Sequence, residues 1–240
     1  MKIIAHRGAS GEFPENSLLA FEQALLQGCD GIEFDAQYHQ PSGEFILLHD
    51  SYLEYHGKQV HFNQLPLSTL LNLTSDAKQN ICTLTQALHC IGGKTSINIE
   101  LKSAAQGQHL SEEMAKLAQV IQHAEQQKLI SYQQIIVSAF NHHIVVDIAQ
   151  RLPEITTAAL IACCPIDYAS FCQKLPVQML NISINGINQA LVSDAQRRGL
   201  KVWVYTVDNP EQIQQCLQYQ VDGIFTNFPL RSRQALSASK

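Results

Sequence analysis

Several features that mark other classes of protein are absent from this sequence of 240 residues. No run approaches the roughly 20 apolar residues that a membrane-spanning helix requires, so no stable membrane insertion is expected. The net charge is −5 and the basic residues are scattered, which gives no support for nucleic-acid binding. Strand-like sequence begins at residue 3 and leaves no room for a secretion signal. These absences predict a cytoplasmic protein.

The cysteine pattern lacks the features of a disulfide framework. The seven cysteines are odd in number and none is spaced as Cys-x-x-Cys. Reduced thiols in core positions are therefore favoured over disulfides or a metal site. Apolar residues make up 45% of the chain and charged residues only 15%, which is typical of a globular protein with a sizeable core. We expect residues 1–240 to form a single domain.

Short apolar runs alternate with helix-period segments along most of the chain. Strands are expected at 3–5, 31–35, 45–48, 97–101, 135–138, 157–161, 179–182, 201–205 and 223–226. Helices are expected at 16–27, 83–90, 111–126, 141–151, 167–175, 189–198, 210–219 and 230–236, with Ser111 and Asn141 as caps. Alternation of this kind predicts a parallel sheet, and about eight units in this length predict a closed (β/α)8 TIM-type barrel.

One expected strand exceeds the eight of a barrel. No helix separates 45–48 from 31–35, and parallel neighbours need a crossover of a dozen or more residues. We therefore expect an antiparallel hairpin that turns near residue 42 and places Asp35 roughly opposite His49. The polar stretch at about 51–80 is then a small insertion after the strand that ends in His49-Asp50, too poor in apolar periodicity for a core of its own. The last residues, 237–240, are expected to fray.

Polar side chains gather at the ends of the expected strands, where (β/α)8 enzymes carry their active sites. In a strand, residues two apart share a face, which pairs Glu33 with Asp35 and Glu100 with Lys102. The residues at four consecutive strand ends are His6 and Arg7, Glu33 and Asp35, His49 and Asp50, and Glu100 and Lys102.

Each of these residue types has a task if the substrate is a phosphodiester. Glu33, Asp35 and Glu100 supply hard oxygen ligands, which suit Mg²⁺ or Ca²⁺ better than zinc. Arg7 and Lys102 can neutralise the phosphate and the charge that develops on its oxygens. His6 and His49 titrate near neutrality, so one can accept a proton from the nucleophile while the other protonates the leaving alkoxide.

Two other interpretations of these residues fit the pattern less well. A lone histidine or a single Glu-x-Asp pair at a strand end is readily explained by a structural role. Eight polar residues at four consecutive strand ends are not. A glycosidase, with two carboxylates as acid and base, would leave both histidines and both cations without a task.

These residues resemble the glycerophosphodiester phosphodiesterases over nearly the whole chain. The matching segments, in the family's order, are AHRGASGEFPENS, GIEFDAQ, LLHD, NIELK, VSAFNH, VWVYTVD and GIFTNFP. The resemblance implies a barrel with a small inserted segment and one divalent cation on Glu33, Asp35 and Glu100. It further implies a catalytic pair, His6 and His49, and phosphate contacts from Arg7 and Lys102. The implied reaction splits a glycerophosphodiester into an alcohol and sn-glycerol 3-phosphate, with the glycerol 2-hydroxyl as a first nucleophile.

The chain departs from the family pattern at two places. SYLEYHGKQ follows the His-Asp pair where members commonly have Arg-Thr-Thr, so the insertion has changed. Tyr205 precedes Thr-Val-Asp where members usually have tryptophan before Thr-Val-Asn. The resemblance implies that this aromatic lines the glycerol side of the substrate, which makes Tyr205 a substrate-binding candidate. Trp203, two residues earlier, is expected to pack in the barrel core.

Two alternatives within reach of this resemblance stay open. One is a relative that cleaves sphingomyelin or lysophospholipids in the manner of a phospholipase D, for which 51–80 would have to hold a membrane-binding loop. The other is a non-catalytic barrel that binds a phosphoester, although no expected histidine or metal ligand is lost. The sequence leaves the head group, the choice between Mg²⁺ and Ca²⁺, and the oligomeric state undetermined.

Overall fold

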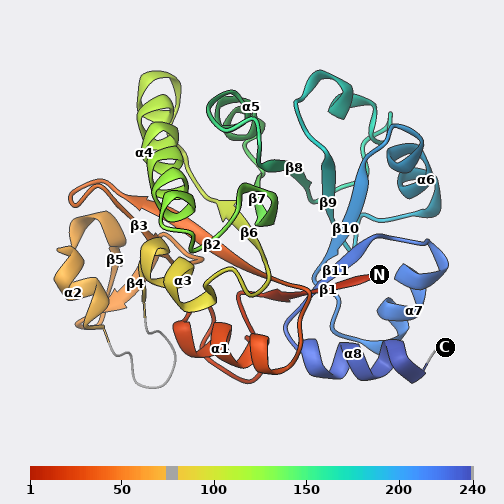
Figure 1. The fold of residues 1–240 in the computed structure, drawn as a ribbon, viewed down its shortest axis with the longest axis horizontal. Coiled ribbons are helices and arrows are strands. Elements are labelled where there is room, and N and C mark those ends of the chain that lie inside the picture. Colours follow the sequence, from red (N-terminus) through yellow and green to blue (C-terminus); the bar gives the residue numbers. More distant parts are fainter. Residues whose placement is uncertain (74–80, 239–240) are drawn as a thin grey trace.

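A closed parallel barrel forms the centre of the molecule in the computed structural model, which describes residues 1–73 and 81–238 (Figure 1). Within the described residues, eight strands run parallel, and β1 pairs with both β11 and β2 to close the sheet. The barrel strands are β1 (Lys2–His6), β2 (Gly31–His39), β6 (Ser96–Leu101), β7 (Ile135–Ala139), β8 (Thr156–Ile161), β9 (Met179–Ser183), β10 (Lys201–Tyr205) and β11 (Gly223–Thr226). The predicted (β/α)8 barrel is thus confirmed.

Helices follow the strands and cover the outside of the barrel. They are α1 (Leu18–Leu26), α3 (Leu84–Ile91), α4 (Gly107–Gln126), α5 (His142–Arg151), α6 (Gln189–Arg197), α7 (Pro210–Gln218) and α8 (Pro229–Ala238). Short 3₁₀ helices are η2 (Tyr132–Gln134), before β7, and η3 (Ser170–Lys174), after β8. The predicted α-helix at 167–175 is therefore wrong. No helix in the part of the chain that the structure describes is long and apolar enough to cross a membrane.

The first residues of three helices can be compared with their predicted starts. Asn141 caps α5 as expected, and its side chain accepts a hydrogen bond from the His143 amide. Helix α1 is capped by Ser17 rather than opened by Asn16, whose φ of 55° is left-handed. Helix α4 begins at Gly107, four residues before the predicted cap Ser111. A polar residue near the helix start therefore predicted the presence of all three helices. It predicted the correct first residue only for α5.

The surplus strand forms the predicted hairpin. Strand β3 (Glu44–Leu47) runs antiparallel to the extended end of β2, with Ala36 opposite Leu47. The Leu48 amide donates to the Asp35 carbonyl oxygen over 3.1 Å, so Asp35 lies opposite Leu48 rather than His49. The hairpin still returns His49 to the rim at the C-terminal ends of the barrel strands, one residue from the predicted register.

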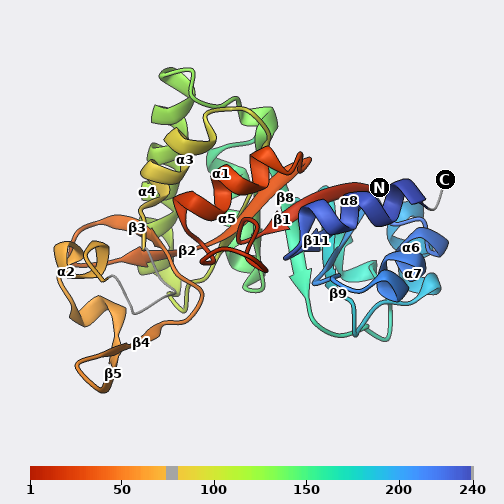
Figure 2. The same cartoon turned by 90° about the horizontal axis from the view of Figure 1, so that it is seen from below.

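The insertion after this hairpin is a small folded unit. It contains β4 (Tyr52–Tyr55), β5 (Lys58–His61), η1 (Phe62–Gln64) and α2 (Leu67–Leu71), and both views place it at the end of the molecule away from α6 and α7 (Figures 1 and 2). Its buried apolar residues Leu53, Phe62, Leu65 and Leu70 share one cluster with Ile46 and Leu48 of the hairpin and with Ile81. The predicted ranges 51–80 and 237–240 extend over residues 74–80 and 239–240, which lie outside the described residues.

The inside of the barrel is apolar at one end and polar at the other. One buried cluster inside the barrel joins six residues: Ile4, Ile136, Ala158, Met179, Trp203 and Phe225. Trp203 is 3% exposed and packs edge-on against Phe225, as expected for a core residue. Inward-facing positions nearer the C-terminal strand ends are polar instead, which leaves that rim for chemistry.

Candidate active site

Strand register brings the three predicted metal ligands together. Asp35 on β2 lies beside Glu100 on β6, and Glu33 lies beside His6 on β1. One carboxylate oxygen from each of Glu33, Asp35 and Glu100 lies within 4.8 Å of the others. Oε1 of Glu33 is buried and accepts no hydrogen bond from the residues that the structure describes. An all-oxygen cluster with an unpartnered carboxylate oxygen is chemically suited to a hard divalent cation.

Electrostatics divides these carboxylates into two kinds. Burial, together with the charges of Asp35 and Glu100, raises the pKa of Glu33 well above its ordinary value. Burial likewise raises the pKa of Glu100, with Asp35 adding to the effect. Burial acts in the same sense on Asp35, but Lys102 and Arg7 outweigh it and lower the Asp35 pKa. The cluster thus contains one firmly ionised carboxylate and two that are costly to ionise without a further positive charge.

Arg7 is placed by a left-handed turn at the end of β1. Its φ is 56°, and the next residue, Gly8, has a φ of 81°. The Arg7 amide donates to Oε2 of Glu33 over 2.9 Å, while its Nε lies 3.0 Å from Oδ2 of Asp35. Its Nη1 donates to Glu15, also over 2.9 Å. The guanidinium is therefore fixed beside the carboxylate cluster and half-buried.

Lys102 follows the end of β6 on the same face as Glu100. Its Nζ lies 2.8 Å from Oε1 of Glu100 and 3.2 Å from Oδ1 of Asp35. Burial opposes the charge of this ammonium, but Asp35 and Glu100 outweigh it and raise the Lys102 pKa. Both predicted cations, Arg7 and Lys102, thus lie against the carboxylates.

His6 ends β1 with its ring between a carboxylate and an amide. Nε2 lies 4.0 Å from Oε2 of Glu33, and Nδ1 lies 2.8 Å from Oδ1 of Asn227. Burial and the neighbouring charge of Arg7 lower the His6 pKa, which favours the neutral ring. A neutral histidine next to a cation site is able to accept a proton.

His49 stands at the outer side of the rim. Its Nδ1 lies 2.8 Å from Oδ1 of Asp50, and its side chain is 36% exposed. Gln37 on β2 holds the backbone here, since its Nε2 donates to the carbonyl oxygens of Leu48 and His49 over 2.7 and 3.1 Å. The charge of His49 lowers the Asp35 pKa, which places the ring within electrostatic reach of the cluster.

Tyr205, the aromatic at the end of β10, also reaches this rim. Its hydroxyl donates to the Ile161 carbonyl oxygen over 2.9 Å, and its ring meets Phe140 edge-on at 6.1 Å. Burial raises the Tyr205 pKa, with the charge of Glu100 contributing, so its hydroxyl stays protonated. The structure therefore brings all eight predicted site residues to one end of the barrel.

Sequence reasoning missed three polar residues that contact this group. Asn16 donates from Nδ2 to Oδ2 of Asp35 over 3.0 Å and accepts from the Asp35 amide over the same distance. Asn227 bonds His6, and Asp208 bonds Asn227. Asp208 and Asn227 follow the ends of β10 and β11, so the rule that selected His6 at the end of β1 would have found them. Asn16 carried no comparable signal, because it stands at the start of the predicted helix 16–27 and not at a strand end.

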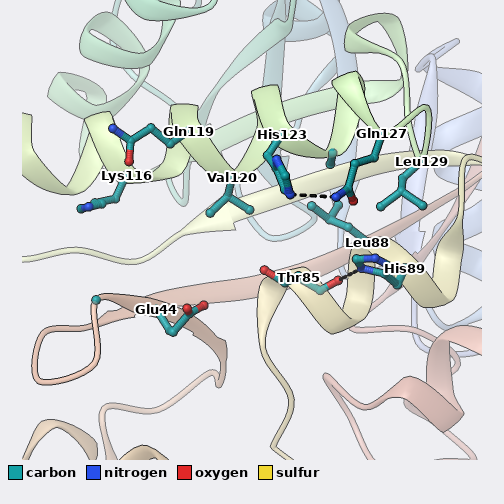
Figure 3. Close-up of a pocket in the computed structure, with 12 residues that line it drawn as sticks. Glu44, Thr85, Leu88, His89, Lys116, Gln119, Val120, His123, Gln127 and Leu129 are labelled. Atoms are coloured by element: carbon teal, nitrogen blue, oxygen red, sulfur yellow. Dashed lines mark hydrogen bonds between the residues drawn. The ribbon is translucent and has the colours of Figure 1, made fainter.

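A groove of about 510 Å³ leads from the cluster to the insertion. Glu100 and Lys102 form one end of its wall, and Ser51, His61 and Asn63 contribute from the insertion side. A second cavity of about 420 Å³ lies between α3, α4 and the hairpin (Figure 3). None of the predicted site residues lines this second cavity. The first groove is thus the one that connects to the candidate site.

Together, the closed barrel and the polar group at the C-terminal ends of its strands define an enzyme of the (β/α)8 class. The Glycerophosphoryl diester phosphodiesterase family matches residues 6–231. The chain belongs to this family, whose members hydrolyse glycerophosphodiesters, and it is a phosphoric diester hydrolase.

Individual relatives cover nearly the full length of the chain. A glycerophosphodiester phosphodiesterase of Caldanaerobacter subterraneus is 28% identical, over 95% of this chain and 94% of that protein. One from Bacillus altitudinis is 29% identical, over 96% of each. Among solved structures, a phosphodiesterase of Oleispira antarctica in complex with the product sn-glycerol-3-phosphate has a TM-score of 0.86 and 25% identity, and covers 99% of this chain and 97% of that one.

Proposed function

We propose that the rim hydrolyses glycerophosphodiesters to an alcohol and sn-glycerol 3-phosphate, with one divalent cation, Mg²⁺ or Ca²⁺, and a histidine pair. The observation that carries the proposal is the cluster of Glu33, Asp35 and Glu100, whose oxygens lie within 4.8 Å of one another. His6 lies directly against this cluster. The Oleispira relative, solved with sn-glycerol-3-phosphate, supports the proposed product.

Glu33, Asp35 and Glu100 would hold the cation. When bound, it supplies positive charge that polarises the phosphate and offsets the charge growing on its oxygens. The unpartnered Oε1 of Glu33 and the raised pKa values of Glu33 and Glu100 support this assignment, because each feature is relieved by a nearby positive charge. Zinc is a poorer fit, since the cluster has neither a thiolate nor an imidazole within it.

Arg7 and Lys102 would bind the phosphate. Arg7 presents a planar fork fixed by Glu15 and Asp35, and Lys102 presents a point charge from the end of β6. The carboxylates that these cations now neutralise would be neutralised by the ion in the loaded site. The guanidinium and ammonium protons are then available to the phosphate oxygens.

The histidines would move the protons. In the first step the glycerol 2-hydroxyl forms a bond to phosphorus and gives its proton to one histidine. The bond from phosphorus to the head-group oxygen breaks, and the other histidine protonates that alkoxide. Water then opens the resulting cyclic phosphate with the proton transfers reversed, and sn-glycerol 3-phosphate leaves.

The two arms of the substrate would extend in different directions from the cluster. Tyr205 is proposed to line the glycerol side, where its ring packs against Phe140. The groove beside Glu100 and Lys102 is proposed to hold the head group, with one wall from the insertion. In this arrangement residues 1–240 work as one barrel domain and the insertion of about 51–80 shapes the substrate site.

The location of the protein is proposed from its cysteines. All seven are free, and three of them are buried. Free thiols persist in a reducing compartment, which favours the cytoplasm. Mass spectrometry of thiol-labelled protein from cells would test this, because oxidised pairs would indicate export.

A substrate panel tests the proposed function. Purified enzyme is stripped with EDTA and assayed for sn-glycerol 3-phosphate with glycerophosphocholine, -ethanolamine, -glycerol and -inositol, each with Mg²⁺ or Ca²⁺. Sphingomyelin and a lysophospholipid serve as comparison substrates. Release of sn-glycerol 3-phosphate supports the proposal, cleavage restricted to the lipids would favour the phospholipase D-like alternative, and binding without turnover would favour a phosphoester-binding barrel.

A further inference from the structure

A chain of hydrogen bonds runs from Asp208 through Asn227 to His6. Nδ2 of Asn227 donates to Oδ2 of Asp208 over 2.6 Å, and Oδ1 of Asn227 lies 2.8 Å from Nδ1 of His6. The three residues stand at the ends of β10, β11 and β1, which are consecutive in the barrel. Neither Asp208 nor Asn227 has a place in the set of proposed metal, phosphate or proton-transfer residues, so their role is open.

The donors and acceptors of this chain allow one arrangement. A carboxylate only accepts hydrogen bonds, so the amide group of Asn227 must turn its Nδ2 toward Asp208. Oδ1 of Asn227 then faces His6 and can only accept. Nδ1 of His6 must therefore carry the proton, and the lone pair of the neutral ring lies on Nε2, the nitrogen that faces Glu33.

Asp208 is itself held in place from β11. Its Oδ1 accepts from the Asn227 amide over 2.8 Å and from the Thr226 hydroxyl over 3.0 Å. Thr226 is fully buried and its hydroxyl also lies 2.9 Å from that of Ser232. With Nδ2 of Asn227, two side-chain donors and one backbone donor converge on this carboxylate. Its orientation is thus set by the strand ends and not by solvent.

We infer that Asp208 and Asn227 are positioning residues that hold His6 in the Nδ1–H tautomer, so that His6 is the proton acceptor of the histidine pair. The inference rests on the proposed function and assigns the direction of its first step. The proton of the attacking hydroxyl passes to Nε2 as that oxygen bonds to phosphorus. Asn227 and Asp208 stabilise the resulting imidazolium, and the second histidine protonates the departing alkoxide.

Asp208→Asn breaks the arrangement without changing its size. The new side chain has only one acceptor oxygen, whereas both oxygens of Asp208 accept hydrogen bonds. One set of donors must therefore lose its acceptor: either the Thr226 hydroxyl with the backbone amide of Asn227, or Nδ2 of Asn227. If Asn227 turns over, it presents Nδ2 to His6 and forces the opposite tautomer. The exchange Asp208→Asn with Asn227→Asp restores every bond, because Nδ2 at 208 then donates to the carboxylate at 227, which again accepts from Nδ1 of His6.

The tautomer can be read without substrate. Nitrogen-15 NMR of the His6 ring at about pH 8, above the ordinary histidine pKa, is expected to show a protonated Nδ1 in the wild type and in the double exchange. A protonated Nε2 in the wild type would overturn the inference whatever the enzyme does. Asp208→Asn is expected to shift the ring toward the Nε2–H form.

Kinetics supply the second arm. Asp208→Asn should lower kcat by roughly 10²- to 10³-fold with KM nearly unchanged, and the double exchange should recover to within about tenfold of the wild type. Asp194→Asn, which removes a carboxylate from an outer network with Arg198 and the Ala169 amide, is the matched control. It should alter stability but neither the His6 tautomer nor kcat per folded molecule.

The outcomes separate this inference from the proposed function. If the wild type turns over glycerophosphodiesters but Asp208→Asn leaves kcat and the tautomer unchanged, the positioning role is wrong and the proposed function stands. Equal loss in the single variant and in the double exchange would also overturn the role. If no glycerophosphodiester is hydrolysed, the proposed function fails, and the NMR result alone decides the tautomer.

Discussion

Lys102 Nζ lies 2.8 Å from Oε1 of Glu100, the residue that precedes it on the same face of the strand. An ammonium this close to a proposed metal ligand can have either of two roles. It can offset the negative charge of the carboxylates when no ion is bound, or it can bind the substrate when an ion is bound. The two roles predict different results for one substitution.

Lys102→Met is expected to cut kcat/KM by one to three orders of magnitude, chiefly through KM, because a phosphate contact is lost. The affinity for Mg²⁺ or Ca²⁺ should stay equal or rise slightly, since a nearby positive charge is gone. Titration calorimetry and steady-state kinetics measure the two effects. Lys116→Met, on the outer surface of α4, is the control. If only the stability of the ion-free protein falls while KM is unchanged, Lys102 stabilises the ion-free carboxylates and does not bind the substrate.

His6→Ala and His49→Ala are each expected to lower kcat by roughly 10²- to 10⁴-fold, because each removes one proton-transfer group. Thermal midpoints should move little for His49, which is 36% exposed. His123→Ala on α4 serves as a matched control away from the rim. A sharp fall in the thermal midpoint of both variants, with activity per folded molecule preserved, would show that the two histidines are structural.

Glu33→Gln, Asp35→Asn and Glu100→Gln are each expected to weaken ion binding and to raise the ion concentration needed for half-maximal activity. The reason is that each removes one anionic oxygen ligand while keeping the side-chain shape. Glu113→Gln on α4 removes a carboxylate outside the cluster and should leave ion affinity unchanged. An unaltered ion affinity in all three cluster variants would refute the metal site.

The raised pKa of Glu33 predicts how ion stabilisation depends on pH. A carboxyl group whose pKa is higher in the folded than in the unfolded state favours folding when protonated, and this contribution is lost as pH rises through the folded pKa. The ion binds the deprotonated form, so the rise in thermal midpoint on adding Mg²⁺ or Ca²⁺ should grow as pH increases above 4.5, the ordinary value.

Calorimetric scans with and without ion from about pH 5 to pH 8 measure this effect. Glu33→Gln should flatten the pH dependence of the ion-free protein over the same range. Asp35, whose pKa is lowered, contributes in the opposite sense: its stabilisation is present above its ordinary pKa and is lost as pH falls through the folded value. An ion effect that shrinks as pH rises would contradict the assignment of Glu33.

Gly8→Ala is expected to be far more costly than Gly28→Ala, although both glycines have left-handed backbones with φ of 81° and 73°. A Cβ at Gly8 would lie 2.7 Å from backbone and side-chain carbon atoms of Ala20, whereas a Cβ at Gly28 meets nothing within 4 Å. We expect a loss of about 2–5 kcal/mol at Gly8 and of about 1–2 kcal/mol at Gly28. Denaturant unfolding measures both, and equal losses would show that the contact with Ala20 is relieved by a shift.

The barrel could be predicted from sequence because strand and helix periods alternate with few interruptions. The first residues of helices were less predictable where two neighbouring polar residues could each act as the cap. Ser17 rather than Asn16 caps α1, since the Asn16 side chain is hydrogen-bonded to Asp35 on β2. That contact joins residues far apart in the chain, so no local pattern could reveal it.

Only part of the site could be predicted, because some of its residues act through contacts between segments distant in the sequence. The strand-end rule selected His6, Glu33 and Glu100, whose side chains carry chemistry of their own. Asp208 and Asn227 stand at equivalent strand ends, but they act on His6 through hydrogen bonds that only the closure of β11 against β1 creates. The hairpin register was off by one residue because a turn centre read from Pro41, Ser42 and Gly43 does not fix which residue begins the return strand.

The most direct test of the account is the release of sn-glycerol 3-phosphate from a glycerophosphodiester by enzyme that has been treated exhaustively with EDTA and then resupplied with ion. The account predicts that the treated enzyme is folded and inactive and that Mg²⁺ or Ca²⁺ restores release of sn-glycerol 3-phosphate. Full activity after EDTA treatment, or a folded, ion-loaded enzyme that releases no sn-glycerol 3-phosphate, would contradict it.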